Sequence, residues 1–289
     1  MKIVRYEEKG GIKLGVVKGN GVIELTRRFL SLSDNMIELI AQWPWLKPNV
    51  EKIIAEKVPD AALTTLRLLA PVARPGKVMA IGLNYADHIK ESGQPTPQYQ
   101  TWFTKAVTSV NGPFDPIQIP VASAMVDYEA ELVVVIGKHC RHVAKGHAVD
   151  VIFGYCAGND VSVRDWQLRT SQWALGKSFD THAPIGPWIV TADELGDPHT
   201  VGIRCFVNGE KRQNSNTGNL VFNVYDQIEH LSEAMTLEPG DLIFTGTPGG
   251  VGGAMKPPVW LKEGDKVRVE IDRVGAIEAT MTAERAEQQ

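Results

Sequence analysis

The sequence predicts a fold built mainly from short β-strands, with a few helices between them. Residues 78–81 and 132–136 are short apolar runs, the second rich in β-branched residues, and both are typical of buried strands. Residues 203–207 end at Asn208-Gly209, which is the strongest two-residue signal for a β-hairpin. Most of the predicted strands are bounded by glycine, proline or asparagine, so the chain reads as strands joined by tight turns.

The composition indicates an ordinary globular protein. The chain has 289 residues, of which 43% are hydrophobic and 22% are charged, with a net charge of −4. Lysine and arginine are dispersed, which argues against a nucleic-acid surface, and no apolar stretch approaches the roughly 20 residues of a membrane span. The N-terminus lacks the apolar core of a signal peptide, and the three cysteines are odd in number and far apart. We therefore expect a cytoplasmic protein with reduced thiols.

The length allows one large domain with a small appendage. Residues 1–71 are predicted to form a small N-terminal domain, and residues 72–289 the larger domain. The boundary falls in residues 70–76, where two prolines and a glycine disfavour both helix and strand. The N-terminal domain is expected to contain short strands at residues 1–6, 13–18 and 21–25.

Helices are predicted from capping residues. In the N-terminal domain, two short helices are expected, one over residues 36–42 after Ser33 or Asp34 and one over residues 50–57 after Asn49. In the larger domain, Asn84 is a candidate cap for a short helix, and Asn223 for a longer one. Asp165 is expected to begin a helix that runs through Gln172.

An acidic pattern precedes the apolar strand at residues 132–136. Asp127, Glu129 and Glu131 occupy alternate positions, so in a strand their side chains would point the same way. Carboxylates held that close repel each other, and a divalent cation with oxygen ligands would relieve the repulsion. An exposed acidic strand end is an equally good interpretation of this spacing alone.

A histidine and a glutamate share one side of the predicted helix after Asn84. His88 and Glu91 are three residues apart, and a carboxylate beside a histidine fixes its tautomer for acid–base catalysis. A solvated surface pair is the more common explanation of that spacing.

Three later residues bear on the same possible site. Asp160 follows a predicted buried strand at residues 153–158, where a carboxylate can complete a metal site. Lys177 lies in a Gly-Lys-Ser sequence that lacks the first glycine of a phosphate-binding loop, so it is either a surface charge or a cation beside the metal. Thr247 lies in the glycine-rich segment 246–253, which can bring backbone N–H groups close to a small anion.

Five motifs together resemble the fumarylacetoacetate hydrolase superfamily, and more narrowly its acylpyruvase and 2,4-diketo acid hydrolase members. They occur in the expected order between residues 72 and 284. They are Gly-Leu-Asn-Tyr-x-x-His-x-x-Glu at 82–91, Asp-Tyr-Glu-x-Glu-Leu-x-x-Val-Ile-Gly-Lys at 127–138, Asn-Asp-Val-Ser-x-Arg-Asp at 159–165, Gly-Lys-Ser-Phe-Asp at 176–180 and Thr-Gly-Thr-Pro-x-Gly-Val-Gly at 245–252.

The resemblance implies a fold and a set of site residues. The fold is α+β, mainly β, with a rolled mixed β-sheet, and the protein is usually a homodimer. The cofactor is Mg²⁺ or Mn²⁺, with Asp127 close to the metal without binding it. The metal ligands are Glu129, Glu131 and Asp160, the catalytic residues are His88 and Glu91 on a mobile lid together with Lys177, and the substrate-binding residues are Arg164, Gln167 and Thr247.

The resemblance also implies a reaction. It predicts a metal-dependent hydrolase that cleaves a C–C bond in a 2,4-diketo acid, either an acylpyruvate or a 2,4-diketo-3-deoxy sugar acid, through a metal-stabilised enolate and a water activated by His88 and Glu91. An oxaloacetate decarboxylase or a 2-keto acid isomerase would use the same enolate and is the alternative. In each case the partner is a small keto acid, not a nucleic acid or a membrane. A binding protein without catalysis is disfavoured because His88, Glu91 and Lys177 are all present.

Overall fold

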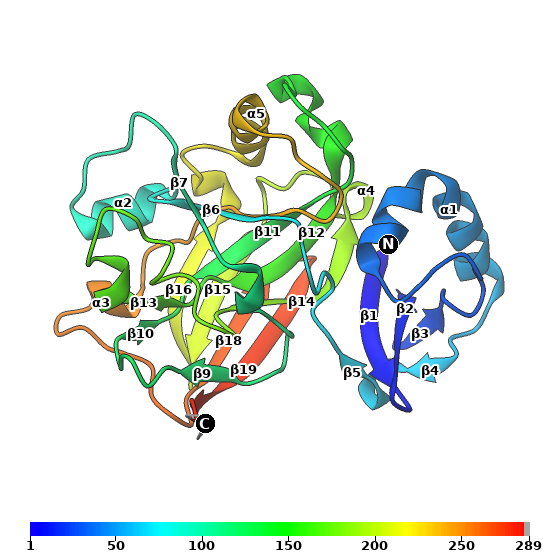
Figure 1. Ribbon diagram of the computed structural model, residues 1–289, viewed down its shortest axis with the longest axis horizontal. Helices are drawn as coiled ribbons and strands as arrows, with labels where there is room; N and C mark the ends of the chain where they lie inside the picture. Colours follow the sequence, from blue (N-terminus) through cyan, green and yellow to red (C-terminus); the bar gives the residue numbers. More distant parts are fainter. Residues whose placement is uncertain (286–289) are drawn as a thin grey trace.

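The computed structural model describes residues 1–285 as an α+β fold dominated by mixed β-sheets (Figure 1). The largest sheet has twelve strands. Ten of them form one path, which in spatial order is β4 (Ala61–Ala62), β3 (Gly21–Glu24), β2 (Gly11–Lys18), β1 (Lys2–Glu8), β14 (Ala183–Thr191), β12 (Ile152–Asn159), β11 (Ala130–Ile136), β17 (Leu242–Phe244), β6 (Val78–Gly82) and β7 (Thr101–Thr104). The remaining two are β5 (Arg67–Leu68), which pairs with β1, and β8 (Val110–Asn111), which pairs with β14.

Two smaller sheets complete the strand structure. A five-stranded sheet has the order β16 (Glu210–Asn216), β15 (Gly202–Val207), β18 (Lys266–Ile271), β19 (Gly275–Ala283) and β9 (Ile117–Ile119). A short ladder joins β10 (Val126–Asp127) to β13 (Ser162–Val163). Parallel pairs such as β17 with β6 occur among antiparallel ones, so the predicted mixed-sheet α+β class is confirmed.

Helical segments are few and mostly short. The α-helices are α1 (Met36–Glu56), α2 (Ala86–Ser92), α3 (Arg164–Gln167), α4 (Ala192–Leu195) and α5 (Val224–Ala234). The 3-10 helices are η1 (Leu63–Thr65), η2 (Val107–Ser109), η3 (Lys145–Val151), η4 (Thr217–Asn219) and η5 (Gly252–Ala254).

The central strand β11 is buried on both faces. Leu132, Val134 and Ile136 pack in one hydrophobic cluster with residues of the five-stranded sheet, such as Ile203. Val133 and Val135 point the other way, into a second cluster that includes residues of β1, β2 and α1. Because alternate side chains of a strand meet opposite faces, burial on both sides explains why this strand is apolar without interruption.

The N-terminal segment joins the large sheet. Strand β1 pairs with β14 through Lys2 and Ile3, and the residues of β1, β2 and α1 pack against the same cluster as Val133. Figure 1 shows this segment, in blue, beside the rest of the chain. The division into residues 1–71 and 72–289 stays a proposal about which parts fold independently.

The two short helices predicted in the N-terminal segment are wrong, because α1 is a single helix. Asn35 is its N-cap, and its side-chain oxygen accepts a hydrogen bond from the Ile37 N–H at 3.0 Å. Pro44 and Pro48 lie inside the helix on its exposed side, where each proline removes one backbone hydrogen bond. A buried stripe that includes Leu39, Ile40 and Leu46 packs on the sheet, and this burial offsets the lost bonds.

Two other capping predictions have different outcomes. Asn223 caps α5 as predicted, with a complete capping box in which the Asn223 side chain accepts from the N–H of Asp226 and the Asp226 side chain accepts from the N–H of Asn223. The helix predicted from Asp165 is wrong, since α3 spans only Arg164–Gln167 and begins after Val163.

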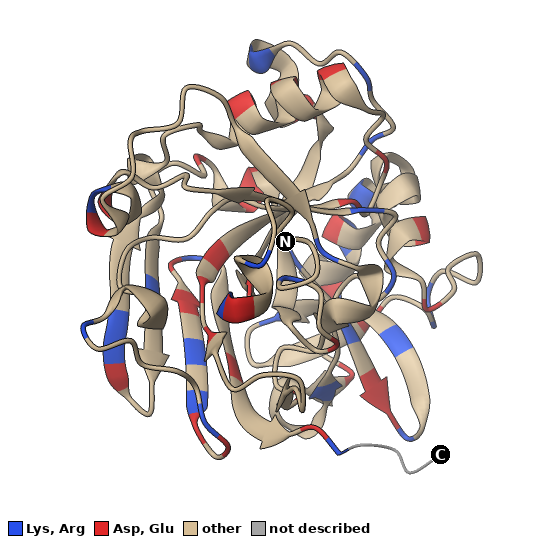
Figure 2. Ribbon diagram, turned by 60° about the vertical axis from the view of Figure 1, so that its left-hand side comes forward, with Lys and Arg blue, Asp and Glu red and all other residues tan. Residues whose placement is uncertain are grey.

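Charged residues of both signs are interspersed over the fold, as Figure 2 shows. All three cysteines, Cys140, Cys156 and Cys205, are free thiols, as predicted.

The revised helix assignments predict opposite effects for two asparagine substitutions. Asn223→Ala should lower the free energy of unfolding by about 1 kcal/mol because it removes the capping box. Asn49→Ala should leave stability unchanged or raise it by up to about 0.7 kcal/mol, because Asn49 is exposed inside α1 and alanine favours helix. Urea unfolding followed by circular dichroism measures both, and a destabilised Asn49→Ala would contradict a continuous α1.

Candidate active site

Three carboxylates converge where β11 and β12 run side by side. The antiparallel register pairs Glu131 with Gly158 and Ala130 with Asn159, and the Asp160 N–H donates to the Glu129 carbonyl at 2.9 Å. Glu129, Glu131 and Asp160 each offer a carboxylate oxygen, and these atoms lie within 4.8 Å of one another. All three side chains are buried, at 5%, 1% and 0% exposed. The strand pairing therefore brings together residues that are about 30 positions apart in the sequence.

Three cations, two of them buried, contact two of these carboxylates. The Lys177 Nζ bridges Glu129 and Asp160 at 2.7 Å from an oxygen of each. The Arg164 guanidinium contacts Glu129 through Nη1 at 2.7 Å. Lys105 contacts the other Asp160 oxygen at 2.6 Å and also donates to the backbone carbonyls of Val161 and Lys177.

Lys105 has no predicted role from the sequence, although its side chain is fully buried in this cluster. In the sequence, Lys105 is simply the residue that directly follows strand β7, and this position does not indicate a site. The contact with Asp160 spans 55 residues, so spacing rules for helices and strands cannot reveal it.

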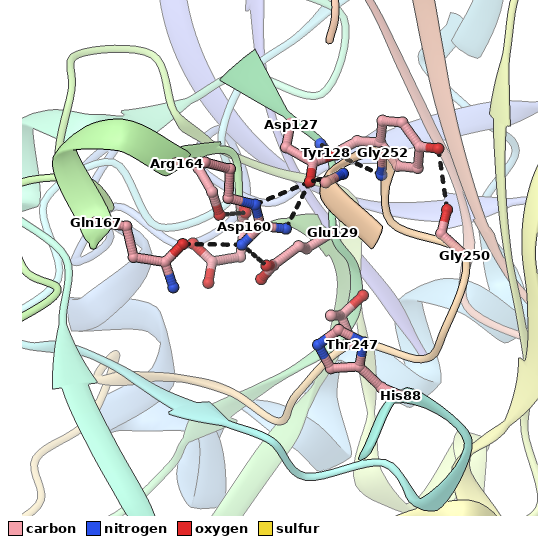
Figure 3. A network of polar contacts seen from close by, with 12 residues as sticks. His88, Asp127, Tyr128, Glu129, Asp160, Arg164, Gln167, Thr247, Gly250 and Gly252 are labelled. Carbon is pink, nitrogen blue, oxygen red and sulfur yellow. Dashed lines mark hydrogen bonds and ion pairs between the residues drawn. The ribbon is translucent and has the colours of Figure 1, made fainter. Parts of the chain in front are cut away.

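Asp127 takes a different set of partners. Its two oxygens accept hydrogen bonds from the N–H groups of Gly252 and Gly253 at 2.8 and 2.9 Å. Arg164 donates to it from Nε at 2.8 Å, and Figure 3 shows this guanidinium between Asp127 and Glu129. Asp127 therefore lies beside the three converging carboxylates without joining them.

Burial and neighbouring charges give the carboxylates different acidities. Burial acts to raise the pKa of Glu129, but Lys177 and Arg164 outweigh it and lower the pKa to about 2. Burial raises the pKa of Glu131 well above its ordinary value, and the charges of Asp160 and Glu129 raise it further. Within the described part of the chain, residues 1–285, no cation contacts Glu131, whose oxygen accepts from the Gly246 N–H at 2.7 Å.

The donor set fits a hard divalent cation. With Asp127 included, four carboxylates face three cations, and among residues 1–285 Glu131 is the one left without a contact of opposite charge. A divalent ion bound to the oxygens of Glu129, Glu131 and Asp160 would supply the cation that Glu131 lacks, and all-oxygen ligands suit Mg²⁺ and Mn²⁺.

A cavity of about 690 Å³ opens above this cluster. Its polar lining includes seven predicted site residues, namely His88, Glu91, Glu129, Arg164, Gln167, Lys177 and Thr247, together with Ser92, Gln94 and Lys256. One side is apolar: the rings of Phe103 and Trp173 lie 5.6 Å apart, and the Lys177 Nζ lies 4.9 Å from the centre of the Phe103 ring. Gly82 allows this packing, since a Cβ there would meet the Trp173 ring at 2.3 Å. The cavity thus has a charged base and an aromatic side.

Helix α2 presents His88 and Glu91 to the cavity. The His88 Nδ1 lies 3.4 Å from a Glu91 oxygen, which is a long contact for a hydrogen bond. Both Glu91 oxygens also accept from the Gly250 N–H at 3.0 Å, and Asp87 accepts from the Ser215 hydroxyl at 2.6 Å. These bonds fasten α2 to the glycine-rich segment and to β16.

Asn84 does not cap α2, which corrects the prediction made from its position. Tyr85 occupies the N-cap position, and the buried Asn84 side chain bonds the backbone of Phe222 and the Thr245 carbonyl instead. Asn84 therefore connects the start of α2 to two distant segments, which satisfies its buried amide.

The backbone N–H groups of the glycine-rich segment serve protein carboxylates. Gly246 donates to Glu131, Gly250 to Glu91, and Gly252 and Gly253 to Asp127. The expectation that these groups bind a small external anion is therefore wrong for these four glycines. Gly246 has a φ of +106°, and a Cβ there would meet the Asn84 Cβ at 2.8 Å, so this position requires glycine.

Gln167 and Thr247 also line the cavity. The Gln167 Oε1 accepts from Arg164 Nη1 at 2.9 Å, which leaves its NH₂ group available (Figure 3). Thr247 receives a hydrogen bond from Gln213, a buried residue that the sequence did not single out. All nine predicted site residues thus lie in or directly beneath one cavity, while their roles stay predictions.

Fold and site together define a class of protein: a mixed-sheet enzyme with a buried Glu-Glu-Asp group beside a lysine and a histidine–glutamate pair. A family model described as "Fumarylacetoacetate (FAA) hydrolase C-terminal" matches residues 77–282. The chain belongs to the fumarylacetoacetate hydrolase family.

Named relatives and solved structures match nearly the whole chain. Oxaloacetate tautomerase FAHD2A, mitochondrial, from Homo sapiens is 43% identical over 283 residues, which is 96% of this chain and 90% of the relative. The structure of maleylpyruvate hydrolase from Sphingobium sp. SYK-6, in complex with manganese (II) ion and pyruvate, is 34% identical with a TM-score of 0.84, and covers 99% of this chain and 100% of its own. A 5-carboxymethyl-2-hydroxymuconate delta-isomerase from Mycobacterium smegmatis is also 34% identical, with a TM-score of 0.79, over 99% of this chain and 100% of its own.

Two findings bear on the cellular location of the protein. Among residues 1–285, no helix has the length and apolarity needed to cross a membrane. Relatives such as the human protein carry the word mitochondrial in their names, which does not match the cytoplasmic expectation cleanly. The location of this chain stays a prediction.

Glu131→Gln should abolish binding of Mg²⁺ and Mn²⁺ and change how stability depends on pH. In metal-free protein, the raised pKa means that the folded state keeps the Glu131 proton longer than the unfolded state, so stability falls as pH rises above the unfolded value near 4.5. The glutamine variant lacks this loss, which amounts to about 1.4 kcal/mol for each unit by which the pKa is raised.

Thermal unfolding from pH 5 to 8 after chelator treatment measures the effect, and the Tm of the variant should exceed that of wild type by more at higher pH. Added metal should raise only the wild-type Tm. Glu263→Gln, at an exposed position, is the control and should behave as wild type. Metal binding of wild-type affinity by Glu131→Gln in calorimetry would contradict the ligand assignment.

Proposed function

We propose that the protein is a divalent-metal-dependent enzyme that interconverts the enol and keto forms of oxaloacetate or a closely related 2-oxo acid. The observation that carries this proposal is the uncompensated Glu131 in a buried three-carboxylate cluster, beneath a cavity that also holds His88 and Lys177. The 42–43% identity to several oxaloacetate tautomerases supports it. The sequence ranked hydrolysis first and placed isomerisation in the alternative, and the names of these relatives favour the alternative.

The cofactor would be held by Glu129, Glu131 and Asp160. A divalent cation held by these residues would supply a Lewis acid that stabilises negative charge on a 2-oxo acid. Lys177 and Arg164 add fixed positive charge at the same end of the cavity, where each is paired with Glu129. Because ion pairs hold both cations in place, they would need little reorganisation when negative charge develops on the substrate.

His88 is the proposed proton carrier. In the enol-to-keto direction, the hydroxyl at C2 loses a proton and C3 gains one; in the reverse direction, His88 removes the proton from C3. Glu91 orients the imidazole through its contact with Nδ1 and supports the imidazolium form. Gln167 and Thr247 are proposed to donate hydrogen bonds to the oxygens of the substrate.

Hydrolysis of a C–C bond is the second candidate, and the size of the cavity favours it. A volume of about 690 Å³ exceeds what a four-carbon acid fills, and its aromatic side suits a longer acyl chain. In this reaction His88 takes a proton from water, the hydroxide attacks C4, the C3–C4 bond breaks, and C3 receives a proton. A solved relative named maleylpyruvate hydrolase, with manganese and pyruvate, supports this candidate. For either reaction, we propose that the substrate is a small keto acid and that the protein is a homodimer.

A substrate panel separates the two candidates. Oxaloacetate supplied as its enol and acetylpyruvate are each incubated with Mg²⁺, with Mn²⁺ and with chelator. We expect the metal to accelerate ketonisation, which is measured as loss of the ultraviolet absorbance of the enol. Release of acetate and pyruvate from acetylpyruvate would instead establish hydrolysis, and no acceleration over the spontaneous rate with either compound would refute both.

His88→Asn should lower kcat by a factor on the order of 10² to 10⁴, because general acid–base catalysis contributes about that much. Binding of Mg²⁺ and of oxalate, an analogue of the enolate, should be unchanged, since His88 is not among the carboxylates and cations of the cluster. Calorimetry measures the binding and stopped-flow absorbance the rate.

The chain offers a matched control for this substitution. His147 and Asp150 have the same spacing, with a contact of 3.1 Å, but lie exposed on η3 outside the cavity. His147→Asn should therefore retain wild-type kcat. An unchanged kcat in His88→Asn would show that another group carries the proton.

A further inference from the structure

Gln213 is the only fully buried residue of strand β16, whose other residues are exposed or partly exposed. It is 1% exposed and lies outside the five motifs of the sequence. The strand reaches the glycine-rich segment because residue 250 is glycine, since a Cβ there would meet the Arg212 carbonyl oxygen at 2.0 Å. This close approach puts the Gln213 amide next to Thr247.

Two backbone contacts fix which way the Gln213 amide faces. The Ala130 N–H can only donate, so the atom that it meets at 2.9 Å is the Oε1 of Gln213. The Pro248 carbonyl can only accept, so the atom 2.8 Å from it is Nε2. The remaining hydrogen of Nε2 is then directed at the Thr247 Oγ1, at 2.8 Å.

This orientation decides what the Thr247 hydroxyl can do. Its oxygen accepts from Gln213, so its own hydrogen is free for another acceptor. Within residues 1–285 the hydroxyl makes no other hydrogen bond, and Thr247 lines the cavity. The hydroxyl is therefore held as a donor beside the cavity.

We infer that Gln213 is a positioning residue that keeps Thr247 as a hydrogen-bond donor to an oxygen of the substrate. The inference rests on the proposed function, in which that oxygen gains negative charge during enolisation. Ala130 lies between Glu129 and Glu131, so the same amide also ties the donor to the strand that carries the carboxylates. Gln213 thereby sets the distance between the donor and the metal ligands.

Reversing the donor direction tests the inference. Gln213→Glu keeps the volume and the acceptor for Ala130 but removes both N–H donors, so the carboxylate accepts the Thr247 hydrogen and turns it away from the cavity. We expect kcat to fall by a factor on the order of 100, as for Thr247→Val, because each change removes one donor to developing charge. KM should change little, since the donor acts more strongly on the transition state than on the bound substrate.

A double-mutant cycle separates this role from a structural one. If Gln213 acts through Thr247, adding Gln213→Glu to Thr247→Val should lower kcat by no more than about twofold further. Thr247→Ser, which keeps the hydroxyl, should retain activity within a few-fold and should lose it when Gln213→Glu is added. Gln213→Met, which carries no charge, repeats the cycle if the glutamate variant does not fold.

The outcomes also distinguish this inference from the proposed function. Wild-type kcat in Gln213→Glu, or an equal loss in the wild-type and Thr247→Val backgrounds, would overturn the role of Gln213. Metal-dependent turnover by wild type and oxalate binding by the variants would leave the proposed function standing in either case. If wild type shows no metal-dependent turnover, the proposed function fails first.

Discussion

The cluster of opposite charges at the ends of β11 and β12 is the constraint on which the rest of the structure depends. Glu129, Asp160 and Lys177 are almost completely buried, and the Lys177 Nζ lies 2.7 Å from a carboxylate oxygen of each of the other two. Removing one partner of a buried ion pair typically costs about 3–5 kcal/mol, because the other charge is left without compensation. The charged groups must therefore be held in a fixed arrangement. Strand β11 provides this rigidity, since its apolar residues 132–136 are packed on both faces of the sheet.

The glycine-rich segment extends this arrangement to the other elements. Its backbone N–H groups bind carboxylates from β11, from α2 and from the end of β10, through Glu131, Glu91 and Asp127. One short loop thus ties the proposed metal ligands to the helix that carries the proposed base. The backbone of this segment can come close enough to donate these hydrogen bonds only where the residue has no Cβ, as at Gly246.

Patterns in the sequence predicted correctly those features that depend on interactions between residues close together in the sequence. The alternation of Glu129 and Glu131, the apolar strand and the Asn223 cap depend on neighbours in the sequence, and the structure has them as expected. Tertiary contacts decided the rest. Packing on the sheet carries α1 through two prolines, and Asn84 bonds distant backbone instead of capping its helix. Lys105 and Gln213 could not be found, because their partners lie 55 and 83 residues away and follow no spacing rule.

The division of the site into two parts explains how one structure can serve either proposed reaction. In both proposed reactions negative charge develops on a 2-oxo acid, and the charged base of the cavity would stabilise it. The base therefore cannot choose between them. The choice depends on whether a water molecule lies between His88 and C4 of the substrate, and this depends on the residues around the open part of the cavity. The aromatic pair Phe103 and Trp173 forms the apolar side of the cavity, so an acyl chain that packs on these rings would determine whether His88 meets water or carbon.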